Sequence, residues 1–218
     1  MLSSGLTLIF SMMGVLNFAH ASFYMLGAYF AYQTGLVFGF WPALFLAPIL
    51  VGVVGAITER YGLRKVHKFG HVAELLFTFG LAYVIEEVVH LIWGRAPVDY
   101  RIPESLNFTL FTLFNTQYPA YRAFMMIISV GMLISLFLVL TKTRIGLIVQ
   151  ASLTHPDMVQ ALGHNVPRVF MLVFAGGCAL AGLAGVLGGN LFITEPGMAF
   201  AVGSIVFVVV VVGGMGSL

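Results

Sequence analysis

The sequence predicts an all-α membrane protein, a polytopic transmembrane helical bundle of six to seven segments. Hydrophobic residues make up 60% of the 218 residues and only 8% carry a formal charge, whereas soluble domains average about 25% charged residues. Uncharged runs cover residues 1–58, 123–141, 169–194 and 196–218, and about 20 apolar helical residues cross the hydrocarbon core. These runs lack the alternation of barrel strands, and a backbone in lipid must satisfy its own hydrogen bonds, so helices are expected.

Each hydrophobic run predicts one or more membrane segments, placed to within a few residues. In chain order we expect segments at residues 5–16, 18–38, 41–58, 72–93, 123–141, 169–190 and 199–218. The run 1–58 is too long for two straight spans and short for three. We therefore expect one broken or steeply tilted piece, with the break at Asn17. All segments form one membrane domain over residues 1–218, which we expect to be a piece of a chain longer at both ends.

Basic residues predict the orientation. Residues 59–71 and 142–168 hold seven Lys and Arg, and 94–122 holds three, so the first two segments are predicted to be cytoplasmic. Residues 94–122 and 191–198 then face outward, and three prolines argue against long helices in the former. The net charge of +2 is small and its carriers lie between spans, which gives nucleic-acid binding no electrostatic basis. The single cysteine, Cys178, is expected to be a small buried hydrophobe.

Polar residues interrupt the first hydrophobic run at Asn17, His20 and Ser22. Polar side chains at membrane depth are costly unless they face protein or water, and broken helices can line a substrate cavity. These residues are therefore candidates for a substrate pathway. The alternative, which stays open, is a short structural turn with Asn17 as its cap.

Two adjacent carboxylates, Glu86 and Glu87, fall well inside the segment 72–93. Neighbouring helical positions differ by about 100°, so the two cannot share one face. At least one is expected to face the bundle or an aqueous cleft, as a pathway residue, a proton relay or an interhelical hydrogen-bonding group. We name Glu86 for the pathway, although the sequence does not decide between the two. His90, one turn beyond Glu86, is the expected partner.

Small residues recur every four positions in the sixth segment, at Gly177, Ala181, Gly185 and Gly189. This spacing gives one helix face almost no side chains, which favours close packing of membrane helices.

The predicted cytoplasmic segment 142–168 contains a short helix. Thr154 or His155 can cap it, Pro156 suits its first turn, Asp157 complements the helix dipole and Gly163 can end it. Met158 and Leu162 share a face of this helix, so an apolar knob must dock against something. The two alternatives are the lipid headgroup region and a groove on a soluble partner.

Several blocks spread over nearly the whole chain carry a family resemblance. The blocks are residues 5–10, 14–20, 23–29, 59–60 with 62–64, 144–146, 161–165, 179–185 and 212–218. In these blocks the chain resembles the membrane permeases of bacterial branched-chain amino-acid ABC transporters, with Asn17-Phe18-Ala19-His20 and the coupling region as the specific parts. In many relatives glycine follows the histidine, where this chain has Ala21 and Ser22. The coupling loop here has His155-Pro156, where acidic or asparagine residues are usual.

The resemblance implies a transport subunit and not an enzyme, with no catalytic residue, no metal and no cofactor of its own. ATP and Mg would be bound by partner subunits. The implied partners are a second homologous permease subunit, two ATP-binding subunits, a periplasmic substrate-binding protein and membrane lipid, in the bacterial inner membrane. The coupling residues would be Asp157, Met158, Ala161, Leu162 and Gly163, which would move when the ATP-binding subunits close.

Two other functions compete with this one. Similar permeases import urea, short amides, sugars or nucleosides, and the sequence does not separate these cargoes from branched-chain amino acids. An ion-coupled secondary transporter would use Glu86 or Glu87. A membrane enzyme has the least support, because no HExxH motif and no serine–histidine pair with catalytic spacing occurs.

Overall fold

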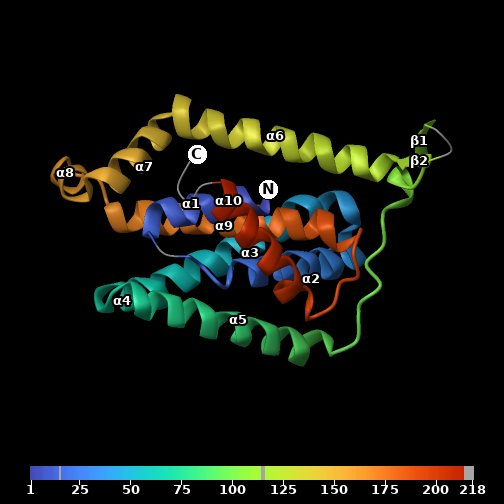
Figure 1. Cartoon of the computed structure of the whole chain (residues 1–218), viewed down its shortest axis with the longest axis horizontal. Coiled ribbons are helices and arrows are strands. Elements are labelled where there is room, and N and C mark those ends of the chain that lie inside the picture. Colours follow the sequence, from blue (N-terminus) through green and yellow to red (C-terminus); the bar gives the residue numbers. More distant parts are fainter. Residues whose placement is uncertain (15, 114–115, 214–218) are drawn as a thin grey trace.

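The computed structural model describes residues 1–14, 16–113 and 116–213 and consists mainly of apolar helices arranged as one elongated bundle (Figure 1). The main apolar helices are α1 (Leu2–Met13), α2 (His20–Phe38), α3 (Phe40–Thr58), α5 (His71–Trp93), α6 (Ala120–Lys142), α9 (Val166–Gly189) and α10 (Met198–Gly213). The shorter elements are η1 (Glu59–Leu63), α4 (Arg64–Val66), η2 (His67–Phe69), η3 (Glu104–Leu106), α7 (Arg144–Thr154), α8 (Pro156–Ala161) and the strands β1 (Thr109–Leu113) and β2 (Thr116–Pro119).

The helical membrane class agrees with the sequence prediction. Within the described residues, four helical stretches are long and apolar enough to cross a membrane, and α1 and α10 are shorter apolar helices. The four stretches are Phe40–Phe69, His71–Trp93, Ala120–Lys142 and Val166–Gly189. The predicted count of six to seven spans is larger and stays a prediction. Val15 and residues 214–218, which belong to the first and last predicted segments, lie outside the described residues.

The first hydrophobic run is broken where the sequence predicts it. Helix α1 ends at Gly14, whose φ of 65° is left-handed and whose N–H donates to the Phe10 carbonyl. Glycine adopts this conformation without the Cβ penalty of other residues, so it stops a helix readily. Helix α2 begins only at His20, which leaves Asn17 inside the break. Helix α2 is buried over most of its first 12 residues, His20 to Ala31, whereas Leu36, Val37 and Phe38 at its end are exposed.

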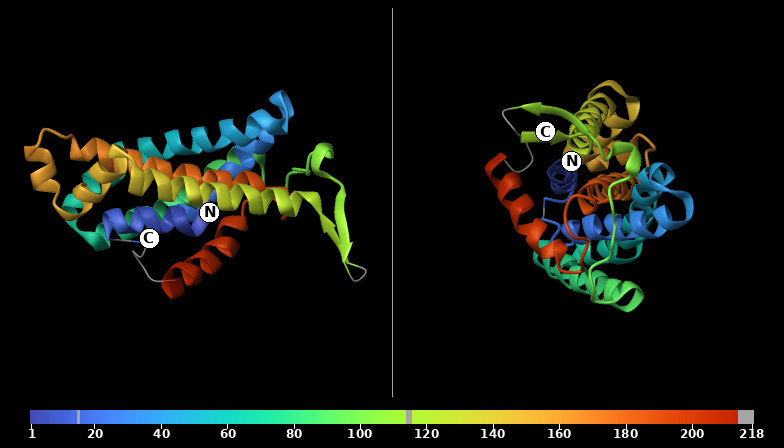
Figure 2. Two further views of the ribbon diagram at one scale, coloured as in Figure 1. Left: turned by 90° about the horizontal axis from the view of Figure 1, so that it is seen from above. Right: turned by 90° about the vertical axis from the view of Figure 1, so that its right-hand side faces the viewer.

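Helix α9 lies at the centre and packs against α1, α2 and α3 (Figures 1 and 2). The predicted small-residue face forms these contacts, because a Cβ on Gly185 would overlap the Tyr24 backbone carbonyl of α2 and one on Gly177 would meet Ile9 of α1. Ala181 is fully buried, and a Cβ on Gly189 would meet Ala28. Close backbone approach therefore replaces side-chain interdigitation along this helix.

Helix α6 lies at the periphery of the bundle (Figure 1). Most of its side chains are exposed, and it is tied to α9 at one end, where the Tyr121 hydroxyl donates to the Leu187 carbonyl at 2.8 Å. Asn190 in turn donates to the Tyr121 hydroxyl oxygen. A long apolar helix with so little protein contact is suited to a lipid or protein neighbour.

The loop 94–122 contains a small antiparallel hairpin, β1 with β2, which the sequence analysis did not predict. The expectation that no long helix forms there is correct. The Val98 N–H donates to the Thr194 carbonyl at 2.9 Å, so this loop lies beside the 191–198 turn, as the orientation argument requires. Burial raises the pKa of the Tyr100 phenol in this loop above its usual value.

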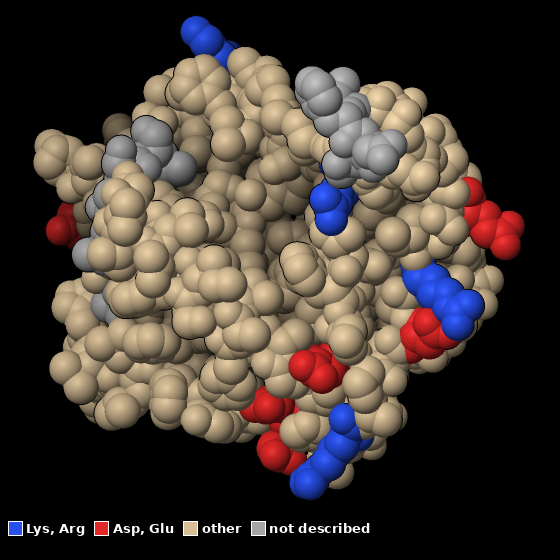
Figure 3. Space-filling view, turned by 45° about the vertical axis from the view of Figure 1, so that its right-hand side comes forward, with Lys and Arg blue, Asp and Glu red and all other residues tan. Residues whose placement is uncertain are grey.

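The two predicted cytoplasmic segments meet at the opposite end of the bundle. The elements α4 and α8 lie together at one end in Figure 1, and the hairpin lies at the other. Figure 3 shows a broad area without charged side chains over the left and centre of the view, while most lysines, arginines and carboxylates lie on the right and at the bottom. Charge is therefore distributed as expected for a bundle whose middle lies in lipid.

Candidate functional site

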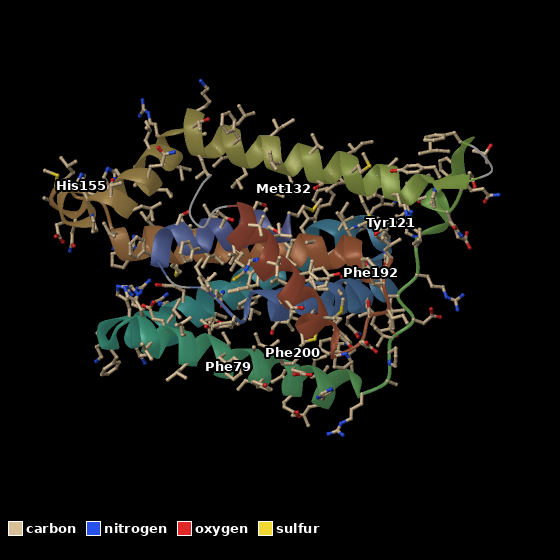
Figure 4. All side chains as sticks on the ribbon, in the orientation of Figure 1. Phe79, Tyr121, Met132, His155, Phe192 and Phe200 are labelled. Carbon is tan, nitrogen blue, oxygen red and sulfur yellow. The ribbon has the colours of Figure 1, made fainter. Side chains whose placement is uncertain are left out.

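A cavity of about 440 Å³ opens at the break between α1 and α2. Helices α1, α2, α5 and α10 contribute to its walls, which are mainly apolar. The lining includes Asn17, His20, Phe79, Ala82, Phe200 and Phe207. Figure 4 labels Phe79 on α5 and Phe200 on α10, which both line the cavity. The volume lies within the range of small-molecule pockets, and a largely apolar lining with a few polar groups is their usual composition.

Asn17 lies in the break and is 4% exposed. Its Oδ1 accepts a hydrogen bond from the Ala19 N–H at 3.1 Å, which is the structural turn that the sequence analysis kept as an alternative. Its Nδ2 has no hydrogen-bond partner among the described residues. A buried amide donor without a partner costs free energy unless something pairs with it.

His20 begins α2 and is 2% exposed. Its Nε2 lies 3.0 Å from the Leu2 carbonyl oxygen of α1, and because a carbonyl only accepts, Nε2 carries the proton and donates. The bond joins α1 to α2 across the break. The other ring nitrogen, Nδ1, is buried and has no partner within the described part of the chain, so a neutral ring offers an acceptor there.

The structure brings Asn17 and His20 together at the cavity but not Ser22 or Glu86. Ser22 is buried in α2 and Glu86 is partly buried on α5, yet neither lines this cavity. Glu87 is exposed, with 67% of its side-chain surface accessible.

The prediction that His90 pairs with Glu86 is wrong. Its Nδ1 lies 3.6 Å from Oε1 of Glu87, three residues earlier, and not beside Glu86. Both i,i+3 and i,i+4 spacings bring side chains together on a helix, so spacing alone could not choose between the two carboxylates.

A buried carboxylate that the sequence analysis did not single out lies at the other end of α5. Glu74 is fully buried, and its Oε1 makes a short contact with His67 Nδ1. His71 Nδ1 lies 3.8 Å from its Oε2. The signal was present in the sequence, because histidines three and seven residues before a glutamate at a helix start can reach it.

The short helix of the cytoplasmic segment forms as predicted. His155 is the N-cap of α8, Pro156 occupies its first turn, and Gly163 follows with a φ of 88°. Figure 4 labels His155 at the tip of the bundle. Asp157 and Ala161 are exposed.

The apolar knob on α8 is also present. Met158 is 67% exposed and Leu162, four residues later, is 79% exposed. Val159 faces inward and is buried, which fixes the helix on the bundle and leaves the knob free. Helix α8 is thus fixed to the bundle by Val159, and Met158 and Leu162 form an exposed apolar surface.

Comparison with known proteins gives consistent matches over the whole chain. A family model described as "Branched-chain amino acid transport system / permease component" matches residues 1–218. The chain is similar to the high-affinity branched-chain amino acid transport system permease protein LivH of Escherichia coli (strain K12), with 26% identity over 235 residues that cover 100% of this chain and 75% of that protein. It is 23% identical to the corresponding permease protein BraD of Pseudomonas aeruginosa, with the same two coverages.

An archaeal relative matches a shorter stretch. The probable branched-chain amino acid transport permease protein LivH of Methanocaldococcus jannaschii is 30% identical over 197 residues, covering 85% of this chain and 60% of that protein. No solved structure matches the chain.

Proposed function

The chain belongs to the family of permease components of branched-chain amino acid transport systems, and on that premise we propose that it forms the membrane pathway of an ATP-driven importer in the bacterial inner membrane. The observation that carries the proposal is the family match over residues 1–218. The chain transports and does not itself hydrolyse ATP.

The proposed assembly contains this chain, a second homologous permease subunit, two ATP-binding subunits and an external substrate-binding protein. ATP and Mg²⁺ are bound by the ATP-binding subunits. The exposed knob of Met158 and Leu162 supports a soluble partner at α8, and the exposed apolar side chains of α6 support a membrane neighbour. The residues 1–218 act as one domain with six to seven membrane segments.

Coupling in this assembly passes from α8 into the bundle. Closure of the ATP-binding subunits moves Asp157, Met158, Ala161, Leu162 and Gly163. Residues 162–165 connect α8 directly to α9, which packs on α1, α2 and α3. Because α1 and α2 flank the cavity, a tilt of α9 changes its opening. Small shifts of packed helices are a common way for a domain to switch between two states.

The chemistry of the cavity favours a branched-chain amino acid as cargo. The unpaired Asn17 Nδ2 is a donor suited to the substrate carboxylate, and His20 Nδ1 is an acceptor suited to the ammonium group; both atoms are buried in this structure, so they meet the substrate when the helices around the cavity move. Phe79, Phe200 and Phe207 give an apolar wall for the side chain. An apolar side chain gains about 25 cal/mol for each Å² removed from water, which favours leucine, isoleucine and valine over urea or a sugar.

Reconstitution tests this function directly. The complete complex in proteoliposomes is expected to import labelled leucine only with ATP and the binding protein, and unlabelled isoleucine and valine are expected to compete. If urea or a sugar competes instead, that solute and not a branched-chain amino acid is the cargo. Uptake driven by a proton or sodium gradient without ATP would replace the ATP-driven mechanism by ion coupling at Glu86 or Glu87.

Replacing Asn17 or His20 by leucine is expected to lower the transport rate roughly tenfold, the effect of losing about 1.4 kcal/mol of substrate hydrogen bonding. The measurement is leucine uptake per assembled complex. Ser204→Ala is the matched control, because Ser204 lines the same cavity but its hydroxyl already donates to the helix carbonyls of Phe200 and Ala201.

The two variants also separate the pathway from a structural turn. Asn17 and His20 both make local hydrogen bonds, so a purely structural role predicts loss of assembly before loss of transport. If assembly falls in step with uptake, the pathway role of these residues is wrong.

Replacing Gly163 by proline is expected to remove substrate-stimulated ATP hydrolysis. Gly163 has a φ of 88° and its N–H donates to the Gln160 carbonyl at 3.0 Å, whereas proline requires a φ near −65° and has no N–H. The end of α8 must therefore rearrange. Gly163→Asn is the control, because asparagine tolerates the left-handed region. Equal ATPase rates in both variants would remove α8 from the coupling pathway.

A further inference from the structure

Arg64 joins the helical connection before α5 (residues 59–70, below called the loop) to the beginning of α9. Its Nη2 donates to Glu59 Oε2 at 2.8 Å and to the Pro167 carbonyl at 2.7 Å, and its Nε donates to Glu59 Oε1 at 3.2 Å. Pro167 lies in the first turn of α9 and is 103 positions away in the sequence. We call this arrangement the Arg64 clasp, defined as Arg64, the Glu59 carboxylate and the Pro167 carbonyl.

Burial makes the clasp energetically significant. The Glu59 side chain is only 7% exposed and that of Arg64 is 38% exposed. A buried carboxylate requires a partner, and a two-pronged arginine pair is the strong form of that partnership. The guanidinium is therefore held in a fixed direction, which aims the second N–H of Nη2 at the Pro167 carbonyl.

The clasp borders a cleft of about 220 Å³ between the loop and the connection from α8 to α9. Gln160, on the last turn of α8, and Phe170, on α9, line this cleft together with Leu63. The connection from α8 to α9 therefore meets the loop across open space, and Arg64 spans that space with direct hydrogen bonds. A rigid link across a gap can transmit displacement where side-chain packing is incomplete.

A second polar link continues the path into α5. His67, in the same loop, contacts the buried carboxylate of Glu74 on the first turn of α5. Helix α5 packs against α2 and against this loop. Further along, Phe79 and Ala82 of α5 line the cavity at the α1–α2 break. The path thus has two polar links, Arg64 to Pro167 and His67 to Glu74, joined by the backbone of the loop, and it continues along helix α5 to Phe79 and Ala82.

We propose that Arg64 is a positioning residue of the import cycle, which transfers the displacement of α8 to α5 and so moves the cavity wall that carries Phe79 and Ala82. The proposal deepens the proposed function and rests on it. Helix α9 contacts α1, α2 and α3, and the Arg64 clasp adds a direct link from the start of α9 to the segment that leads into α5. The α1–α2 side and the α5 side of the cavity then respond to the same event on the ATP-binding subunits.

The role requires arginine and not only a positive charge. Lysine is a single point donor on a flexible stem, whereas the planar guanidinium makes several directed hydrogen bonds at once. Arg64→Lys keeps the charge beside Glu59 but cannot keep the two-pronged pair and the Pro167 bond together.

The test uses the complete complex in proteoliposomes and measures leucine imported per ATP hydrolysed. Arg64→Lys and the double variant Glu59→Gln with Arg64→Met are expected to assemble and hydrolyse ATP, while import per ATP falls at least about fivefold, the lower bound of typical coupling between sites. The double variant leaves no buried unpaired charge, so its loss cannot come from a stranded Glu59. Lys65→Ala, an exposed cation in the same loop, is the matched control and is expected to match the wild type.

A second readout follows the cavity wall itself. Cys178 is fully buried, whereas Phe79 is 47% exposed and lines the cavity, so Phe79→Cys supplies the reactive thiol of this chain. Its labelling rate by a water-soluble thiol reagent is expected to change when a non-hydrolysable ATP analogue is added, and this change is expected to vanish when Arg64→Lys is combined with it. A structural role for Arg64 would change assembly and not this nucleotide response.

The outcomes separate this proposal from the proposed function. If the wild-type complex shows no ATP-dependent import, the proposed function fails. If the wild type imports leucine and the Arg64 variants keep both the import per ATP and the labelling response, the proposed function stands and the Arg64 clasp has no positioning role.

Discussion

Leu162→Asp is expected to abolish substrate-stimulated ATP hydrolysis in the reconstituted complex while the chain still inserts into the membrane. Leu162 is 79% exposed and, with Met158, forms the apolar knob of α8. A knob that fills a pocket on a partner is a typical interface hot spot, and its loss costs about 3 kcal/mol, or roughly a hundredfold in affinity. Aspartate adds the cost of burying an unpaired charge.

The measurement is ATPase activity with and without loaded binding protein, together with recovery of the ATP-binding subunits on the tagged permease chain. Leu162→Met is the matched control, because it keeps an apolar side chain of similar volume. It is expected to keep stimulation close to that of the wild type. Full stimulation in Leu162→Asp would show that the knob does not dock on an ATP-binding subunit.

The alternative of a headgroup-bound helix gives a different result. If the knob rests in lipid, aspartate at Leu162 is expected to weaken membrane association of α8 and to leave the ATPase partners bound.

The orientation of α8 is tested by labelling Asp157→Cys in sealed right-side-out cells, because a cytoplasmic α8 must be unreactive from outside. Reaction there with an impermeant reagent would place the coupling segment on the wrong side of the membrane and end the proposed mechanism.

Local features of the fold could be predicted from the sequence. Continuous apolarity predicts the helices, since in lipid the backbone has few alternatives. The break at Asn17 and the short helix α8 follow from residues within a few positions, namely the left-handed Gly14 and the His155-Pro156 start with Gly163 beyond the end. Caps and breaks depend on neighbours in the chain, so one sequence suffices to place them.

Long-range contacts could not be predicted in this way. The Arg64–Pro167 bond spans 103 positions, and nothing local to either residue indicates it. The hairpin β1–β2 also escaped prediction, because its strands have only five and four residues. The contact of His67 with Glu74 is local, and the missed signal was the position of Glu74 at the start of a helix, where a carboxylate is stabilised by the helix dipole.

Only part of the candidate site could be predicted, and the reason is geometric. Asn17 and His20 line the cavity, whereas Ser22 lies about 200° around the helix from His20 and so points to another face. Glu86 shares a face with Ala82 but lies about 6 Å further along α5. Sequence identifies polar residues at membrane depth, but the cavity depends on how four helices meet.

Gly185→Ala is expected to have the largest effect on folding of any single methyl addition in the bundle core. A Cβ at this position would overlap the Tyr24 backbone carbonyl, and neither backbone can move aside as a flexible side chain would. The helices α2 and α9 must therefore separate. Overpacking of a well-packed core costs about 1–3 kcal/mol, and a clash between backbones places this variant at the upper end.

The single cysteine of the chain makes this prediction measurable. Cys178 lies in the same helix and is fully buried, so a thiol-reactive dye reports unfolding of purified chain as temperature rises. Gly176→Ala is the matched control, because a Cβ there meets nothing within 4 Å and alanine favours a helix by up to about 1 kcal/mol over glycine. Dye labelling is expected at a lower temperature in Gly185→Ala and at an unchanged or higher temperature in Gly176→Ala. Equal shifts in both variants would mean that helix propensity, and not the close approach of α2 to α9, governs stability, and the central position of α9 would then have to be revised.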